Sequence, residues 1–267
     1  MEQYQRKIIC VKRFNPVKSK FVLLDFLFYI IINTNKKLST VHKETCAKGE
    51  MMKYSHILFD LDGTLIDSRE TIRCSFEYAL EKMNVPDPKV LDINSLIGPP
   101  MLKTFQEVYG FSLDEARKGY EFYLEEYVGN GQMYQAQLYE GVKETIHTLY
   151  QKDCFLGVAT TKNETNARKI INSLELDIPI DCIYGTYNDG TRSNKKEIIT
   201  NLLEDNDVLD LADVLMVGDR HYDIIGASEV GIDSVGVTYG CGSEDELRQA
   251  GATHLIASIN DLLEIIK

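Results

Sequence analysis

The sequence lacks an excess of basic residues, and this absence excludes one broad class of partners. Its 267 residues include 29 Lys and Arg against 41 Asp and Glu, which makes the formal net charge −12. Proteins that bind nucleic acids need a basic face to neutralise the backbone phosphates. We therefore expect no nucleic acid polymer as a partner, whereas small phosphate compounds stay open because local donors and metal ions bind them.

Paired cysteines and long apolar segments are also missing. The six cysteines are scattered without a CxxC pair, which excludes a thiolate metal cage and is typical of reduced thiols in a cytoplasmic protein. The apolar run at residues 21–32 has 12 residues, whereas a membrane-spanning helix needs about 20. We therefore expect a cytoplasmic protein with no membrane partner.

The first 51 residues differ in character from the rest of the chain. They carry ten Lys and Arg against four Asp and Glu, whereas residues 52–267 carry 19 against 37. The apolar run at 21–32 could form a buried strand or an accessory helix. The codons before Met51 and Met52 can form a purine-rich run that resembles a bacterial ribosome-binding site. We therefore expect residues 1–51 to be an N-terminal extension that is not translated or not ordered.

From residue 52 onward, short apolar runs alternate with helical segments. Five runs are predicted to be strands, at residues 57–59, 155–159, 214–217, 234–237 and 255–256. Near-continuous apolar strands between helices are typical of a buried parallel sheet. The predicted fold class is therefore α/β, a doubly wound Rossmann-like parallel sheet. We assign residues 52–69 and 138–267 to this catalytic core.

Residues 70–137 show helical periodicity instead, with Ile72, Phe76 and Leu80 on one face and no strong strand. An insert directly after the first strand must lie over the carboxyl ends of the sheet, where it can act as a lid. The sequence therefore predicts a small all-helical cap inserted after the first strand. Its aromatic residues are interpreted as the cap's own core.

Two closely spaced carboxylates follow the first predicted strand, in Asp60-Leu61-Asp62-Gly63-Thr64. Alternation along a strand points Asp60 and Asp62 the same way. Two like charges about 4 Å apart repel by roughly 4 kcal/mol at an effective dielectric constant near 20. Such a pair is kept where a cation or a reaction needs it, although an acidic loop that caps the next helix is the simpler alternative.

Three further elements follow in order along the chain. Thr160 ends the second predicted strand, Lys195 begins a helix, and Asp219 and Asp223 follow the third strand. Together with the Asp60 motif, this order resembles the haloacid dehalogenase superfamily from about residue 53 to the C-terminus. The turn at residues 97–100 is similar to that of its phosphoglycolate phosphatase group with a helical cap, which includes relatives described as 5′-nucleotidases.

The resemblance implies a role for each of these residues. Asp60 would be the covalent nucleophile and Asp62 the general acid and base. Thr160, Thr161 and Lys195 would bind the phosphoryl group, with Thr161 and Lys196 as alternatives to Thr160 and Lys195. Mg²⁺ is the implied cofactor, because hard carboxylate oxygens suit it. The predicted metal ligands are Asp60, Asp62, Asp219 and Asp223.

The predicted activity is therefore Mg²⁺-dependent hydrolysis of a small-molecule phosphate monoester by a monomer or homodimer. The candidate substrates are phosphoglycolate, nucleoside monophosphates and small sugar phosphates. A sugar-phosphate mutase and a phosphonate hydrolase of the same superfamily are the alternatives, and the latter needs a cap lysine such as Lys82 or Lys103. A dehalogenase is disfavoured because a halide leaving group needs no proton from Asp62. An interaction protein that has lost activity is disfavoured because all the charged positions are retained.

Overall fold

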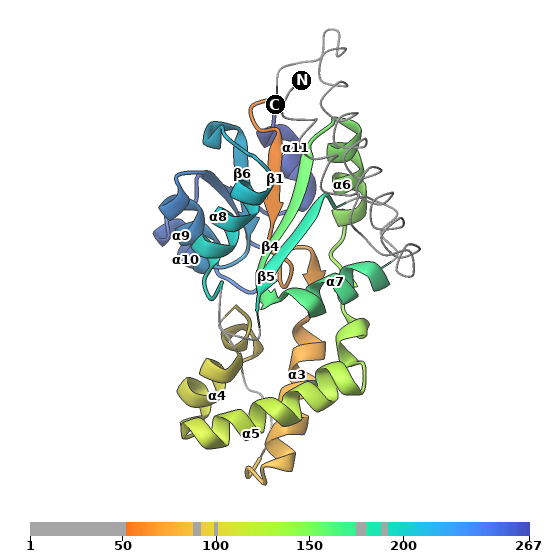
Figure 1. Cartoon of the computed structure of the whole chain (residues 1–267), viewed down its shortest axis with the longest axis vertical. Coiled ribbons are helices and arrows are strands. Elements are labelled where there is room, and N and C mark those ends of the chain that lie inside the picture. Colours follow the sequence, from red (N-terminus) through yellow and green to blue (C-terminus); the bar gives the residue numbers. More distant parts are fainter. Residues whose placement is uncertain (1–51, 88–91, 99–100, 175–179, 188–191) are drawn as a thin grey trace, which may run out of the picture. The chain divides into compact units, whose positions relative to one another are not determined.

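The computed structural model describes residues 52–87, 92–98, 101–174, 180–187 and 192–267 (Figure 1). The predicted extension of residues 1–51 lies outside these residues, as do Pro99 and Pro100 of the predicted turn. Within the described part of the chain, no helix has both the length and the apolar character that crossing a bilayer requires.

A six-stranded sheet with the order β5-β4-β1-β6-β7-β8 forms the centre of the fold, and all its neighbouring strands are parallel. Its strands are β1 (His56–Phe59), β4 (Phe155–Asn163), β5 (Cys182–Thr186), β6 (Val214–Gly218), β7 (Asp233–Val237) and β8 (His254–Ile256). The predicted fold class is confirmed, and the five predicted runs lie in β1, β4, β6, β7 and β8. The short β1 is placed at the middle of the sheet, between β4 and β6.

Helices cover both faces of this sheet, as successive side chains of β1 show. Leu58 packs in a cluster with α8 (Lys195–Asp205) and α9 (His221–Val230), whereas Ile57 and Phe59 belong to a second cluster with α6 (Val142–Gln151), α7 (Glu164–Ser173) and α11 (Leu262–Ile265). Each of these three side chains is fully buried, which stabilises the fold by about 1.5–3 kcal/mol per residue. The core helices are α6 (Val142–Gln151), α7 (Glu164–Ser173), α8 (Lys195–Asp205), η6 (Leu211–Asp213), α9 (His221–Val230), α10 (Glu244–Gln249), η7 (Ile259–Asp261) and α11 (Leu262–Ile265).

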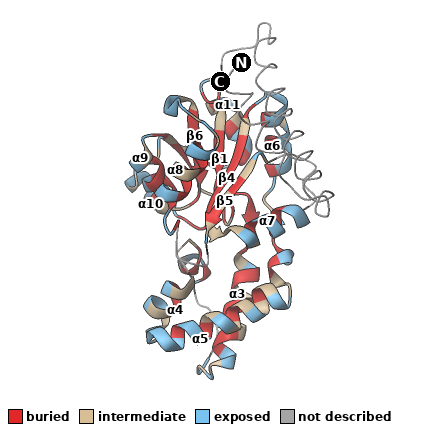
Figure 2. Cartoon of the chain, in the orientation of Figure 1, coloured by how far each residue is buried: buried red, intermediate tan, exposed pale blue. Residues whose placement is uncertain are grey.

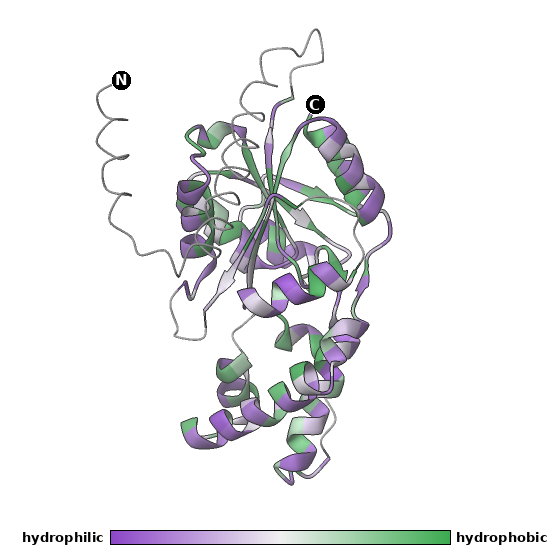
Figure 3. Cartoon of the chain, turned by 45° about the vertical axis from the view of Figure 1, so that its right-hand side comes forward, coloured by the Kyte–Doolittle hydropathy of each residue, from purple (hydrophilic) through white to green (hydrophobic). Residues whose placement is uncertain are grey.

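The burial and hydropathy patterns follow this layered arrangement. Buried residues run along the central strands, and exposed residues lie on the outer sides of the helices (Figure 2). The strands are largely hydrophobic where they converge, and the helices carry hydrophilic residues outward (Figure 3). A parallel sheet that is apolar along its whole length needs this cover on both faces.

The segment between β2 (Ile66–Asp67) and β3 (Gln137–Leu138) is helical, and these two short strands pair antiparallel at its base. Its helices are α3 (Arg69–Lys82), η3 (Ile93–Leu96), α4 (Met101–Tyr109), α5 (Leu113–Leu124), the π-helical turn η4 (Glu125–Gly129) and η5 (Gln132–Gln135). Phe76 lies between Phe105 and Tyr123, with ring centroids 4.7 and 5.2 Å away. The aromatic residues thus form the core of this helical segment, as predicted.

Two features of the sheet structure have no clear signal in the sequence. Strand β5 is an edge strand in which Ile183 and Gly185 are buried and their neighbours are partly exposed. Its sequence therefore lacks the continuous apolar run that identified the other strands. The β2–β3 pair has two residues on each side, which is too short for any periodic signal.

Candidate active site

The candidate residues gather at the carboxyl ends of three adjacent strands. Asp60 follows β1, Asp219 follows β6, and Thr160 lies in the last part of β4. The backbone N–H of Asp60 donates to Val217 O at 2.8 Å, which ties the end of β1 to β6. Open α/β sheets bind ligands at this edge, so the topology itself brings these motifs together.

A glycine allows the chain to turn close beside Asp219. Gly63 has φ +83°, and a Cβ at this position would lie 2.1 Å from Asp219 Oδ2. Both the left-handed backbone and the close approach exclude a side chain here. The carboxylate also accepts hydrogen bonds from the backbone N–H of Cys241 at 2.7 Å and from Thr64 Oγ1 at 3.3 Å. Asp219 is therefore held in one place.

Three carboxylates form a buried cluster at this point. Oxygens of Asp60, Asp219 and Asp223 lie within 4.8 Å of one another, and all three residues are buried. Burial raises the pKa of Asp60 to about 6, with Lys195 opposing the shift and Asp223 adding to it. Burial, with Asp223 and Asp60 nearby, raises the pKa of Asp219 to about 8. The cluster thus concentrates more negative charge than its surroundings neutralise.

Lys195 supplies the positive charge that enters this cluster. Its Nζ lies 2.9 Å from Asp60 Oδ1 and 2.6 Å from Asp223 Oδ1, and it donates to Ala159 O at 2.8 Å. Burial lowers the pKa of Lys195, but Asp223 and Asp60 outweigh burial and raise it overall. Lys195 is only 4% exposed, whereas Lys196 is exposed. Of the two lysines considered from the sequence, Lys195 is the one that lies at the site.

The donor set fits a small divalent cation. Within the described ranges, Asp60, Asp219 and Asp223 are the one group of three or more metal-ligating side chains with converging atoms. When all three carboxyls are ionised, they leave two negative charges in excess of the one ammonium, in surroundings where unpaired charge is costly. Carboxylate oxygens with room for water and phosphate oxygens are the ligands that Mg²⁺ prefers. The residues present are therefore suited to hold Mg²⁺.

The Asp62 carboxylate lies outside this group and has a different partner. Its Oδ2 pairs with Lys162 Nζ at 2.6 Å, and its Oδ1 is buried with no hydrogen-bond partner. The Lys162 ammonium also lies 5.0 Å from the ring centre of Tyr127, a residue of η4. Sequence reasoning gave Lys162 no role, because it lies 100 residues from Asp62 and no local pattern links the two.

The two candidate threonines are used differently. Thr160 is buried, and its Oγ1 accepts a hydrogen bond from the backbone N–H of Lys162 at 3.2 Å, so its own proton is available to an acceptor. Thr161 Oγ1 already donates to Gly98 O at 3.1 Å. Among the described residues, the hydroxyl proton of Thr160 therefore has no acceptor, whereas that of Thr161 is engaged by Gly98 O.

A segment of the helical insert reaches this edge of the core. Besides Gly98 at Thr161, the carbonyl oxygens of Asn94, at 2.8 Å, and Ile97 accept hydrogen bonds from Arg220 Nη1. Arg220 Nε also donates to Glu246 Oε1 at 2.9 Å. Arg220 follows Asp219 directly in the sequence, so this segment of the helical insert is hydrogen-bonded to the loop that carries Asp219.

Comparison with known proteins is consistent with this geometry. Residues 57–237 match the model of a family described as haloacid dehalogenase-like hydrolase. A Pseudomonas aeruginosa protein named 5′-nucleotidase is 38% identical over 216 residues, which cover 81% of this chain and 97% of that protein.

Two solved structures show the same fold over the same part of the chain. A predicted phosphatase from Clostridium acetobutylicum is 35% identical with a TM-score of 0.72, covering 79% of this chain and 97% of that one. A haloacid dehalogenase-like family hydrolase from Streptococcus pneumoniae is 27% identical with a TM-score of 0.74, covering 80% and 99%. The chain therefore belongs to the haloacid dehalogenase-like hydrolase family, as its four sequence elements indicated.

Proposed function

We propose that this protein is a Mg²⁺-dependent phosphatase that hydrolyses small phosphate monoesters through an aspartyl-phosphate on Asp60. The observation that carries the proposal is the contrast between two carboxylates of one motif. Asp60 lies buried beside Lys195 in the carboxylate cluster, whereas Asp62 is held apart on Lys162. This contrast supports attack by Asp60 and proton transfer by Asp62.

The first half-reaction transfers the phosphoryl group to the protein. A carboxylate oxygen of Asp60 attacks phosphorus, and the bond from phosphorus to the ester oxygen breaks. The departing oxygen takes the proton of Asp62, which enters this step in its neutral, protonated form with Lys162 still hydrogen-bonded to its Oδ2. In the second half, a water molecule gives a proton to Asp62 and attacks phosphorus. The bond from Asp60 to phosphorus then breaks, inorganic phosphate leaves, and both carboxylates return to their initial state.

The remaining residues stabilise charge on the phosphoryl oxygens. Lys195 offers a fixed ammonium 2.9 Å from the nucleophile, and Thr160 offers a hydroxyl, with Thr161 beside it. Phosphoryl transfer depends mainly on such positioning and charge stabilisation.

We propose that Asp60, Asp219 and Asp223 hold Mg²⁺. The cation would offset the repulsion between these carboxylates and an anionic substrate. Asp62, also predicted as a ligand, serves in this proposal as the proton carrier, because its carboxylate is engaged by Lys162.

We propose that residues 70–137 form the cap, with 52–69 and 138–267 as the core, and that the segment ending at Gly98 faces the substrate. The relative named 5′-nucleotidase supports a nucleoside monophosphate as the first substrate to test, with phosphoglycolate and sugar phosphates next. A phosphonate hydrolase is not favoured. Of its candidate cap lysines, Lys82 lies exposed over Tyr78 and Lys103 pairs with Glu107 on the surface.

The proposal is tested by phosphate release from p-nitrophenyl phosphate. Asp60→Asn should abolish turnover while the far-UV circular dichroism spectrum stays unchanged. Asp67→Asn removes a nearby carboxylate that pairs with Arg69 instead, and should keep its activity within about threefold, as expected for substitutions outside the site. EDTA should stop turnover and added Mg²⁺ should restore it. Full activity of Asp60→Asn, or turnover that persists after chelation, would overturn the mechanism or the metal assignment respectively.

A further inference from the structure

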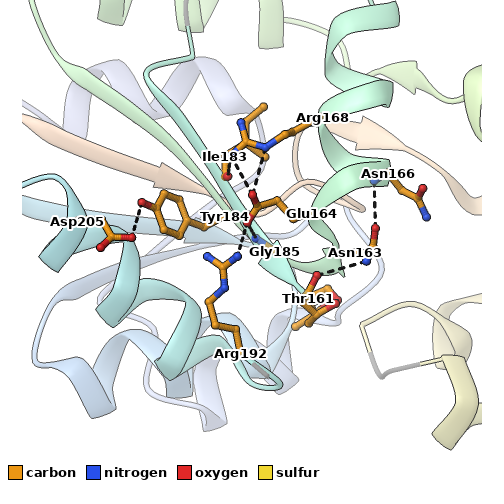
Figure 4. A network of polar contacts seen from close by, with 11 residues as sticks. Thr161, Asn163, Glu164, Asn166, Arg168, Ile183, Tyr184, Gly185, Arg192 and Asp205 are labelled. Carbon is orange, nitrogen blue, oxygen red and sulfur yellow. Dashed lines mark hydrogen bonds and ion pairs between the residues drawn. The ribbon is translucent and has the colours of Figure 1, made fainter. Parts of the chain in front are cut away.

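A buried ion pair joins two segments that each carry candidate residues. Glu164 is the first residue of α7 and lies three residues after Thr161, while Arg192 lies three residues before Lys195. Arg192 Nη2 donates to Glu164 Oε2 (Figure 4), and Arg192 is only 8% exposed. The pair therefore connects the end of β4 to the start of α8.

Aromatic rings enclose the guanidinium of Arg192. Its central carbon lies 3.7 Å from the ring centre of Tyr187 and 5.0 Å from that of Tyr184. Tyr184 is itself anchored, because its hydroxyl donates to Asp205 Oδ2 at 2.8 Å (Figure 4). A planar guanidinium that is both stacked and paired has little freedom to move.

Glu164 is fixed just as firmly on the other side. Its Oε1 accepts from Arg168 Nε and Nη2 at 3.2 and 3.0 Å, and its Oε2 accepts from the backbone N–H of Gly185 at 3.3 Å. A Cβ at Gly185 would lie 2.4 Å from Lys162 O and 2.8 Å from Glu164 N. Gly185 of strand β5 therefore packs closely against the backbone of Lys162 and Glu164.

The backbone of Arg192 adopts a left-handed conformation, which is unfavourable for a residue with a large side chain. Its φ is +51°, and such a conformation costs of order 1–3 kcal/mol. It persists only where the surroundings fix it, and the described contacts of Arg192 are with Glu164, Tyr184 and Tyr187. These side-chain contacts hold the chain three residues before Lys195, and the Asn194 side chain, which accepts from Glu197 N at 3.0 Å, holds it at the start of α8.

We propose that Glu164 and Arg192 form a positioning pair that sets the location of the Lys195 ammonium relative to Thr160 and Asp60. The inference rests on the proposed function of Lys195 in binding the phosphoryl group. Arg192 touches none of the reacting groups in the described contacts, so it acts through Lys195. Misplacement of a catalytic group by about 1 Å can lower a rate by about a hundredfold, which makes the effect measurable.

The test uses a matched pair of arginines that share one carboxylate. Arg192→Met and Arg168→Met each remove one arginine from Glu164, but Arg168 has a side chain 48% exposed on the surface of α7. Arg192→Met should lower kcat with p-nitrophenyl phosphate about ten- to a hundredfold and weaken competitive inhibition by inorganic phosphate. Arg168→Met should change both by less than about threefold. Equal losses in the two variants would overturn the inference.

A double-mutant cycle separates positioning from a general loss of structure. The affinity for inorganic phosphate, measured by calorimetry with Mg²⁺ present, is compared in Arg192→Met, Lys195→Met and the double variant. With no ammonium to place, Arg192→Met should cost less than about twofold in the Lys195→Met background. Additive losses would refute action through Lys195, because independent sites add.

Two further variants keep the test decisive if Arg192→Met does not fold. Arg192→Lys retains the charge without the planar stack and should have an intermediate kcat. Glu164→Gln retains an acceptor and can replace Arg192→Met in the same cycle. Wild-type activity in both folded variants would overturn the inference. Absence of both turnover and phosphate binding in the wild-type protein would instead refute the proposed function, so the two failures are distinguishable.

Discussion

The energetic role of Lys195 is the most direct test of the carboxylate cluster. Lys195→Met keeps an unbranched side chain of similar length and removes the charge that pairs with Asp60 and Asp223 at 2.9 and 2.6 Å. Removing one partner of a buried ion pair costs about 3–5 kcal/mol, because the other charge stays buried without compensation. For a domain of this size each kcal/mol lowers Tm by about 2–4 °C, so the expected loss is roughly 6–20 °C.

The assay is thermal unfolding in EDTA, followed by unfolding with excess Mg²⁺. Lys196→Met is the matched control, since Lys196 is the adjacent residue and is exposed, and its free energy of unfolding should change by no more than about 0.5 kcal/mol. Mg²⁺ should raise Tm more in Lys195→Met than in the wild type, because a bound cation replaces the missing positive charge. A Tm in EDTA within two degrees or so of the Lys196→Met value would refute the reasoning.

Three further predictions concern other groups of the core. Lys162→Met should lower kcat for alkyl phosphates about tenfold or more and for p-nitrophenyl phosphate less, because a poor leaving group depends more on Asp62 as a well-oriented acid; equal losses would contradict this. Thr160→Val should lower kcat/KM about tenfold and Thr161→Val less, since the Thr161 hydroxyl is engaged by a carbonyl; the reverse order would contradict this. Burial raises the pKa of the Cys154 thiol to about 11, so alkylation followed by mass spectrometry should accelerate about tenfold per pH unit from pH 7 to 10.

The sequence predicted the parts of the fold and the site that have local signals. Continuous apolar runs identified five strands, and the carboxylates that follow two of them, Asp60 and the pair Asp219 and Asp223, were predicted to lie together, as they do. Strand β5 was missed because only two alternate residues of it, Ile183 and Gly185, are buried, so its sequence gives no continuous apolar run. The choice of Lys195 over Lys196 came from resemblance rather than from physics, since the burial that separates them depends on the folded chain.

The ion pairs Lys162–Asp62 and Arg192–Glu164 could not be predicted, because the two residues of each pair are distant in sequence. Lys162 lies 100 residues from Asp62, and Arg192 lies 28 residues from Glu164. A lysine near the end of a strand or an arginine in a loop is usually solvated, and only the tertiary structure shows that Lys162 and Arg192 are nearly buried. Sequence patterns show the periodicity of apolar residues and the residues that begin or end helices and strands. An ion pair between two such elements produces no pattern of either kind.

The strand order has a consequence for how such an enzyme can change. Three motifs sit on β4, β1 and β6, which are neighbours in the sheet, and hydrogen bonding holds adjacent strands about 4.8 Å apart. The spacing between Asp60, Thr160 and the loop of Asp219 is therefore set by backbone hydrogen bonds and not by side chains elsewhere. If the inserted helices face the substrate, as we propose, substitutions in them can alter which ester is accepted without shifting that spacing, so selectivity can diverge while the chemistry is inherited unchanged.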